Sequence, residues 1–187
     1  KFLYIMLSTT GVYESKLYDL LKEIIKKNRQ KFKLAFLPKY SGVNIRISKN
    51  DPLLADSDLI KFKSDIYEII GKYIYSEKDE SLQQVIINIL KEKGISLSVA
   101  ESCTGGIISK KITDIPGSSS VYKGGVIAYS NYLKIKLLNI DQSIIGKYGA
   151  VSKEVASLMA EGIKNRTKSD IGIATTGISG PSGGTQD

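Results

Sequence analysis

The stretch Val99–Gly106 constrains the fold most, because it combines a strand, a tight turn and the start of a helix in a few residues. Apolar residues alternate with smaller ones just before it, which predicts a short strand. Apolar residues recur at helical spacing just after it, over Ile107–Ile112. Paired glycines let a backbone approach a ligand, and a helix N-terminus adds positive potential. The turn itself consists of Ser102, Cys103, Thr104, Gly105 and Gly106.

The 187-residue chain contains no histidine, which excludes Ser-His-Asp, Cys-His and histidine–metal chemistry within it. Its single cysteine, Cys103, excludes an internal disulfide and a multi-cysteine metal site. If Ser102 or Cys103 is a nucleophile, its base is a lysine, a carboxylate or water. A desolvated lysine is suitable because burial lowers its pKa. The alternative is a structural Gly-Gly turn whose Ser or Thr merely caps a helix.

Helices and strands alternate over the second half of the chain. A helix over Ser81–Lys93 is expected to end at Gly94, and strands are expected to end near residues 99, 129 and 175. Each strand leads into a turn rich in glycine or hydroxyl groups. Because ligands bind at the carboxyl ends of the strands in an open α/β sheet, these turns predict a site at that edge.

The first half predicts a small α+β unit in the order strand, helix, strand, strand, helix. We see no catalytic constellation in it, and no Gly-x-x-Gly clamp of the kind that RNA-binding KH modules use. The charged connector Glu77–Glu80 predicts a boundary between domains at 1–76 and 77–187. The expected elements are a strand at 1–11, a helix over Glu14–Lys27, a hairpin of Phe32–Leu37 and Val43–Ile47, and a helix over Ser57–Tyr73.

The net charge of +8 favours an anionic partner, either a phosphorylated metabolite or a nucleic acid. The lysines are spread along the chain, so we do not expect specific nucleic-acid binding. No apolar run approaches the roughly 18 residues that span a membrane, so no membrane partner is expected. The opening residues lack both an initiator Met and a signal-peptide pattern. We therefore expect a cytoplasmic protein and a chain that is a fragment of a longer one.

Four segments together resemble the C-terminal domain of the CinA (competence/damage-inducible) family, in order and spacing, over residues 82–187. The first half resembles the small KH-like α+β middle domain of full-length CinA proteins. The resemblance implies a three-layer-like α/β domain with a mixed or parallel sheet, preceded by that small domain. The four segments are Ala100–Gly106, Gly117–Ser119, Tyr129–Asn131 followed by Lys134, and Thr176–Thr185.

The resemblance implies an amidohydrolase that converts nicotinamide mononucleotide (NMN) to nicotinic acid mononucleotide and ammonia, without a metal or cofactor. The alternative is a non-catalytic nucleotide-binding or assembly module. Family members tend to be homodimers or larger assemblies. The family domain also continues beyond the Gly-Gly-Thr loop, so weak or no activity is expected of this exact chain.

Carried over by position, the resemblance makes Ser102 the nucleophile and Lys134 the general base, with Tyr129 positioning the pair or the amide. Lys136 and Lys123 are the alternative bases, and Cys103 is the alternative nucleophile. The oxyanion cradle would comprise Thr104, Gly105 and Gly106. The ribose and phosphate would be held by Gly117, Ser118, Ser119, Thr176, Gly177, Gly180, Gly183 and Gly184.

Overall fold

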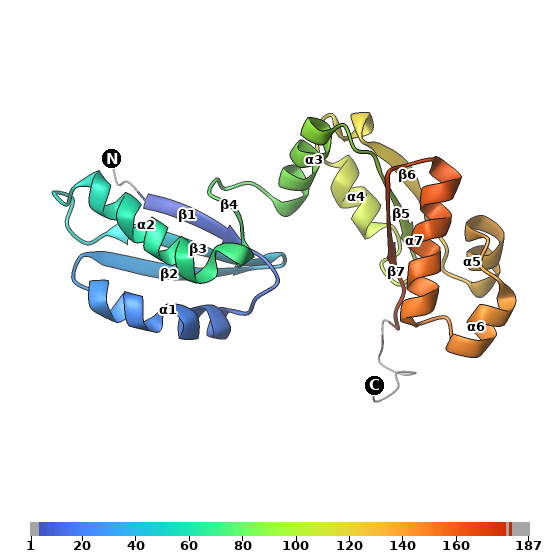
Figure 1. The fold of residues 1–187 in the computed structure, drawn as a ribbon, viewed down its shortest axis with the longest axis horizontal. Coiled ribbons are helices and arrows are strands. Elements are labelled where there is room, and N and C mark those ends of the chain that lie inside the picture. The colour runs from blue at the N-terminus through green and yellow to red at the C-terminus, as the bar shows by residue number, and fades with distance from the viewer. Residues whose placement is uncertain (1–3, 179, 181–187) are drawn as a thin grey trace. The chain divides into compact units, whose positions relative to one another are not determined.

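The computed structural model describes residues 4–178 and residue 180 of the 187-residue chain. It divides into two compact units, 1–85 and 86–187, so the division falls inside helix α3 (Leu82–Lys93). Figure 1 shows the elements of each unit. The domain boundary after residue 76 stays a prediction. Among the described residues, no helix combines the length and the apolar character that crossing a membrane requires.

The first unit is a four-stranded antiparallel sheet packed against two helices, in the strand order β2-β3-β1-β4. Its helices form one core with the sheet, in which Phe32 and Phe62 stack with ring centroids 4.5 Å apart. This is the small α+β unit that the sequence predicts. The elements are β1 (Tyr4–Thr9), α1 (Glu14–Asn28), β2 (Phe32–Lys39), β3 (Gly42–Lys49), α2 (Asp56–Ile70), the 3-10 turn η1 (Gly71–Tyr73) and β4 (Ile74–Ser76).

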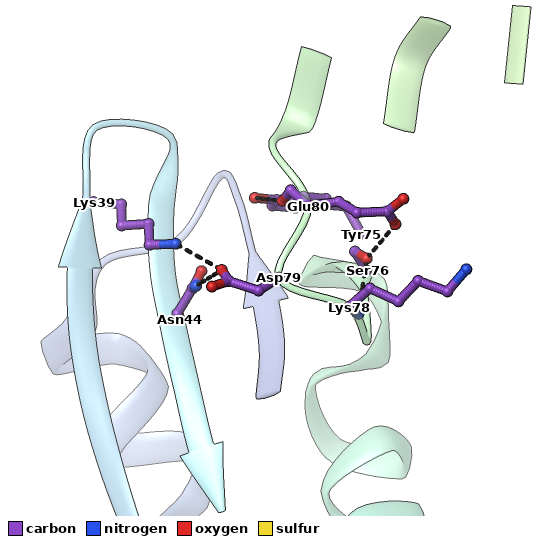
Figure 2. Close-up of polar contacts among 7 residues, drawn as sticks. All are labelled: Lys39, Asn44, Tyr75, Ser76, Lys78, Asp79 and Glu80. Carbon is purple, nitrogen blue, oxygen red and sulfur yellow. Dashed lines mark hydrogen bonds and ion pairs between the residues drawn. The ribbon is translucent and has the colours of Figure 1, made fainter. Parts of the chain in front are cut away.

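The sequence analysis missed strand β4, which adds a fourth strand beside β1. The segment after β4 is attached to the β2–β3 hairpin by side-chain contacts (Figure 2). The Asp79 carboxylate accepts hydrogen bonds from Lys39 Nζ at 3.0 Å and from Asn44 Nδ2 at 3.5 Å. Ser76 Oγ accepts from the backbone N–H of Lys78 and donates to the Glu80 carboxylate. The charged connector is therefore an ordered part of the first unit.

The second unit is a three-stranded parallel sheet in the order β6-β5-β7, with helices on both faces. The central strand β5 is buried along its whole length, and alternate side chains enter different cores. Leu97 and Val99 join the core formed with α3 and α4, whereas Ala100 joins the core formed with α5, α6 and α7. Figure 1 shows α4 and α7 on opposite sides of this sheet.

These three layers confirm the predicted α/β class. Helix α3 ends at Lys93, and Gly94 follows with φ +64°, as predicted. The short helix α6 was not predicted. The remaining elements are β5 (Leu97–Glu101), α4 (Ile107–Thr113), the 3-10 turn η2 (Ser118–Ser120), β6 (Tyr122–Ile127), α5 (Asn131–Leu138), α6 (Gln142–Tyr148), α7 (Lys153–Thr167) and β7 (Ile171–Thr175).

Candidate active site at the carboxyl ends of the parallel strands

The turns after β5, β6 and β7 meet at one edge of the parallel sheet, where they surround a cavity of about 350 Å³. This is the edge at which open α/β sheets bind ligands, and the volume is in the range of small-molecule sites. The lining residues are Ser102, Cys103, Tyr129, Asn131, Lys134, Ala150, Val151, Thr176, Gly177, Ile178 and Gly180.

The turn after β5 is built around the carboxylate of Glu101, which is fully buried. This carboxylate accepts hydrogen bonds from the backbone N–H groups of Gly106, Ile108 and Ser109, at 2.8–3.1 Å, and from Ser109 Oγ at 2.7 Å. Burial raises the pKa of the Glu101 carboxyl, but the hydrogen bonds from Ser109, Thr104 and Ile108 outweigh it and hold the pKa below its usual value. The negatively charged Glu101 carboxylate therefore holds the turn in place at the start of α4, where a negative charge is favourable.

Lys134 Nζ lies 3.0 Å from Ser102 Oγ, and both residues are buried and line the cavity. Lys134 is only 2% exposed. Its amine also donates to the carbonyl oxygens of Ala128, at 3.0 Å, and Tyr129, at 3.1 Å. Helix α5 presents this lysine, and the N-cap Ser130 starts that helix by accepting from the Leu133 N–H. The structure thus joins two residues from different turns in one hydrogen-bonded pair.

Burial lowers the pKa of the Lys134 amine from its usual 10.5, while the neighbouring Cys103 raises it by a smaller amount. The net pKa is lowered, because removing an ammonium from water disfavours its charged form. A neutral lysine amine has two N–H donors and one lone pair. In the structure the amine donates to Ser102 Oγ as well as to the two carbonyls, as a protonated amine does. When the amine is neutral and the two carbonyls accept its N–H groups, its lone pair faces the Ser102 hydroxyl. The pair has the composition and geometry of a nucleophile with its general base.

Lys134 is distinguished by this geometry from the two alternative bases. Lys136 is exposed on α5, and Lys123 is exposed on β6 and lines a different cavity. Tyr129 lines the same cavity as Lys134, but its side chain is 71% exposed, and its backbone carbonyl makes the contact with Lys134.

Two of the predicted oxyanion donors already donate inside the turn. The Gly105 N–H donates to the Ser102 carbonyl at 3.1 Å, and the Gly106 N–H donates to Glu101. Both glycines have positive φ, +59° and +101°, so the tight turn requires them. The Thr104 hydroxyl shares a 2.7 Å hydrogen bond with Thr175 Oγ1, which joins the turns after β5 and β7. The assigned oxyanion roles stay predictions.

The predicted ribose- and phosphate-binding residues are divided between the two edges of the sheet. Thr176, Gly177 and Gly180 line the cavity with Ser102. A side chain at Gly177 would come within 3.1 Å of Cys103 Sγ, so glycine keeps that approach open. Gly183 and Gly184 lie outside the described residues. The segment Gly117–Ser119 precedes β6, so the structure does not bring it to the Ser102 edge.

Several residues of the site were not predicted as site residues. Glu101 lies in the Ala100–Gly106 segment. The sequence feature that could have identified it is a carboxylate between a buried strand and a Gly-Gly turn. Asn131 lies just after the strand that is predicted to end near residue 129, in the polar turn that follows it. Ala150 and Val151 carry no chemical signal, and they reach the site because the Ala150 carbonyl accepts a 2.8 Å hydrogen bond from Thr176 Oγ1.

Comparison with known families matches both halves of the chain. The family described as "CinA C-terminal domain" matches residues 79–187, and that described as "Damage-inducible protein CinA KH domain" matches residues 6–76. A "putative competence-damage inducible protein" of Caldicellulosiruptor saccharolyticus is 42% identical over 97% of this chain and 44% of its own length. A "CinA-like protein" of Dictyoglomus turgidum is 41% identical over 96% of this chain and 44% of its own. The chain thus spans less than half the length of these relatives.

Solved structures resemble about half of the chain. The competence/damage inducible protein CihA of Agrobacterium tumefaciens is 39% identical, with a TM-score of 0.55 over 56% of this chain and 64% of that one. A competence-damaged protein (CinA) superfamily protein of Escherichia coli is 34% identical, with a TM-score of 0.54 over 55% of this chain and 60% of that one. With both halves matched and relatives about 40% identical over nearly its whole length, the chain belongs to the CinA family.

Proposed function

We propose that this chain carries an amidohydrolase site that hydrolyses the carboxamide of NMN, giving nicotinic acid mononucleotide and ammonia. The observation that carries the proposal is the buried contact of 3.0 Å between Lys134 Nζ and Ser102 Oγ. Membership of the CinA family and the position of the pair in a strand-end cavity support it. The substrate and the product rest on the family resemblance.

The reaction begins with attack of Ser102 Oγ on the carboxamide carbon, while the neutral Lys134 amine takes the hydroxyl proton. The resulting tetrahedral oxyanion needs N–H donors. The family resemblance assigns this role to the turn of Thr104, Gly105 and Gly106, in which the Gly105 and Gly106 amides already donate to other acceptors. Lys134 then returns the proton to the leaving nitrogen. Ammonia departs and an ester with Ser102 remains.

Water completes the reaction by attacking the ester carbon, again with Lys134 as the base. The carboxylate product leaves and Ser102 recovers its proton through Lys134. The carbonyls of Ala128 and Tyr129 orient the amine throughout, because each accepts one of its N–H groups. Thr176, Gly177 and Gly180 line the part of the cavity that we assign to the ribose phosphate.

The test is to measure ammonia and nicotinic acid mononucleotide released from NMN by the parent chain and by Lys134→Ala. The proposal predicts equal amounts of both products from the parent, at the weak rate that the resemblance leads us to expect of this chain, and a further loss of about a thousandfold in kcat in the variant. Lys136→Ala is the matched control, because that lysine is exposed on the same helix, and it should keep the parent rate. Binding of NMN by the parent without any release of ammonia would favour a non-catalytic nucleotide-binding module instead.

A further inference from the structure

A second cavity lies at the opposite edge of the parallel sheet, where the strands begin. It measures about 440 Å³, within the range of small-molecule sites. Ser96 of this cavity directly precedes β5, whereas Ser102 directly follows it. Five strand residues at about 3.3 Å each separate the two edges by roughly 16 Å. The lining residues are Lys91, Gly94, Ile95, Ser96, Ser120, Val121, Lys123, Lys168 and Asp170.

The charge of this cavity is strongly positive. Three lysines line it, and within the described part of the chain none of the three has a carboxylate partner at ion-pair distance. The one lining carboxylate, Asp170, accepts hydrogen bonds from the backbone N–H of Ser96 at 2.8 Å and from Ser96 Oγ at 2.6 Å. Asp170 therefore has a structural role, in tying the start of β5 to the start of β7.

The three lysines come from three separate parts of the unit, and the Lys91 amine contacts backbone. Lys91 Nζ donates to the Pro116 carbonyl at 3.3 Å, and a side chain at Gly117 would come within 2.8 Å of that amine. Lys168 follows α7 in the left-handed conformation, with φ +54°. Gly or Asn is the usual residue there, so a lysine is not explained by the needs of the backbone.

We propose that this cavity binds a small phosphate-bearing anion at a site separate from the Ser102 edge. Lys91, Lys123 and Lys168, which all line the cavity, supply the charge. A concave site with three cations fits one phosphoryl or pyrophosphoryl group better than a nucleic acid, which needs a basic track along several phosphates.

The experiment titrates the full 187-residue chain with inorganic pyrophosphate, by calorimetry and by amide NMR shifts. The key variant is Lys168→Asn, because asparagine suits a left-handed position and should preserve the fold while removing the charge. Lys123→Gln removes a second charge from an exposed strand position. Lys136→Gln, an exposed lysine that does not line this cavity, is the matched control for net charge.

The proposal predicts that shifts centre on Gly94, Ser96 and Ser120. Affinity should fall about fivefold for each lysine replaced at 123 or 168, as expected from one charge pair near the surface, and should be unchanged in the control. The proposal would be overturned by no binding at millimolar pyrophosphate, by binding that the two lysine variants leave unaltered, or by shifts confined to the Ser102 edge. Binding of a single-stranded RNA oligonucleotide without binding of pyrophosphate would also overturn it.

Discussion

Lys134 shows how burial can convert an ordinary surface residue type into a base. Residues 134 and 136 are two positions apart on α5, which places them about 200° apart around the helix axis. One is therefore buried against Ser102 and the other is exposed. From the residues alone, lysines 123 and 136 remain alternatives to Lys134. The resemblance favoured Lys134, but the distance to Ser102 depends on two turns that only the folded sheet brings together.

The lowered pKa of Lys134 predicts how activity depends on pH. A base must be neutral, so the rate of NMN hydrolysis should rise with pH through the folded-state pKa of Lys134, which lies below 10.5, and then level off. Because the unfolded chain holds this proton more tightly than the folded one, Lys134 also makes stability rise with pH between the folded-state pKa and 10.5.

The measurement is kcat/KM for NMN over a pH series in which the fold remains intact. Lys134→Arg provides the comparison, since a guanidinium stays protonated and should be inactive at every pH. A parent rate that is independent of pH below 10.5 would contradict the role of Lys134 as the base.

Glu101 predicts a different pH response, of stability rather than of chemistry. Its folded-state pKa is lowered, so its stabilising contribution is present above the usual value of 4.5 and is lost as the pH falls through the folded-state pKa. Glu101→Gln should lower the free energy of unfolding by about 2 kcal/mol at neutral pH, because the amide cannot accept all four hydrogen bonds.

Urea unfolding at a series of pH values measures both effects for Glu101. The variant should lose less stability than the parent on acidification below 4.5. Glu154→Gln on α7 is a suitable control, because Glu154 is exposed and accepts no hydrogen bond among those found in the described chain. Equal stability of the parent and Glu101→Gln at neutral pH would contradict the role of Glu101 as the anchor of the turn.

At the scale of elements, helices α5 and α7 approach closely because residue 162 is glycine. A Cβ atom at this position would lie 2.2 Å from the Leu138 carbonyl oxygen, so the helices would have to separate. Gly162→Ala should therefore destabilise the chain by about 2 kcal/mol, although alanine favours helix. Gly146→Ala in α6 is the matched control, since no neighbouring atom lies within 4 Å, and it should stabilise by about 1 kcal/mol.

Thermal unfolding of the two glycine variants gives the measurement. A gain in stability for both would show that helix propensity outweighs the packing of α5 on α7. A loss of stability for Gly162→Ala alone would confirm that the close contact with the Leu138 backbone leaves no room for a side chain at residue 162.

The long helices could be predicted from the sequence, and so could short elements that border a Gly-rich turn, such as the five-residue β5 and the seven-residue α4. Helices α1, α2, α3 and α7 each repeat their apolar residues over three turns or more, which periodicity detects. Strand β4, with three residues, is too short for a period to be visible, and helix α6 was also missed. The edge to which Gly117–Ser119 belongs was also beyond sequence patterns, because it depends on β6 beginning at Tyr122, after this segment.

At the scale of the whole molecule, each unit has its own apolar core. Among the described residues, none of the three core clusters includes residues from both units. The described residues that line the Ser102 cavity all belong to the second unit. The alternation of helices and strands in the second half of the chain predicted that the site lies in this unit. The side chains that close the cavity from Ala150 and Val151 could not be predicted, because they are brought there by tertiary contact.

The separate cores predict that damage to the first core leaves the site intact. Phe62→Ala should destabilise the first unit by about 4 kcal/mol, because Phe62 is buried and stacked on Phe32. Amide hydrogen exchange should quicken over residues 4–85 and stay as in the parent over residues 86–178. Met159→Ala, in the core beneath the site, should show the reverse pattern. Equal acceleration in both units for Phe62→Ala would contradict separate cores.

The most direct test of the proposed chemistry compares two neighbouring nucleophiles, Ser102 and Cys103, which both line the cavity. The measurement is the rate of ammonia release from NMN by Ser102→Ala and by Cys103→Ala, beside the parent and with NMN binding checked by calorimetry. We expect Ser102→Ala to lose about 10⁴-fold in kcat while still binding NMN, and Cys103→Ala to stay near the parent rate. Turnover that survives in Ser102→Ala and disappears in Cys103→Ala would contradict a Ser102–Lys134 pair as the catalytic centre.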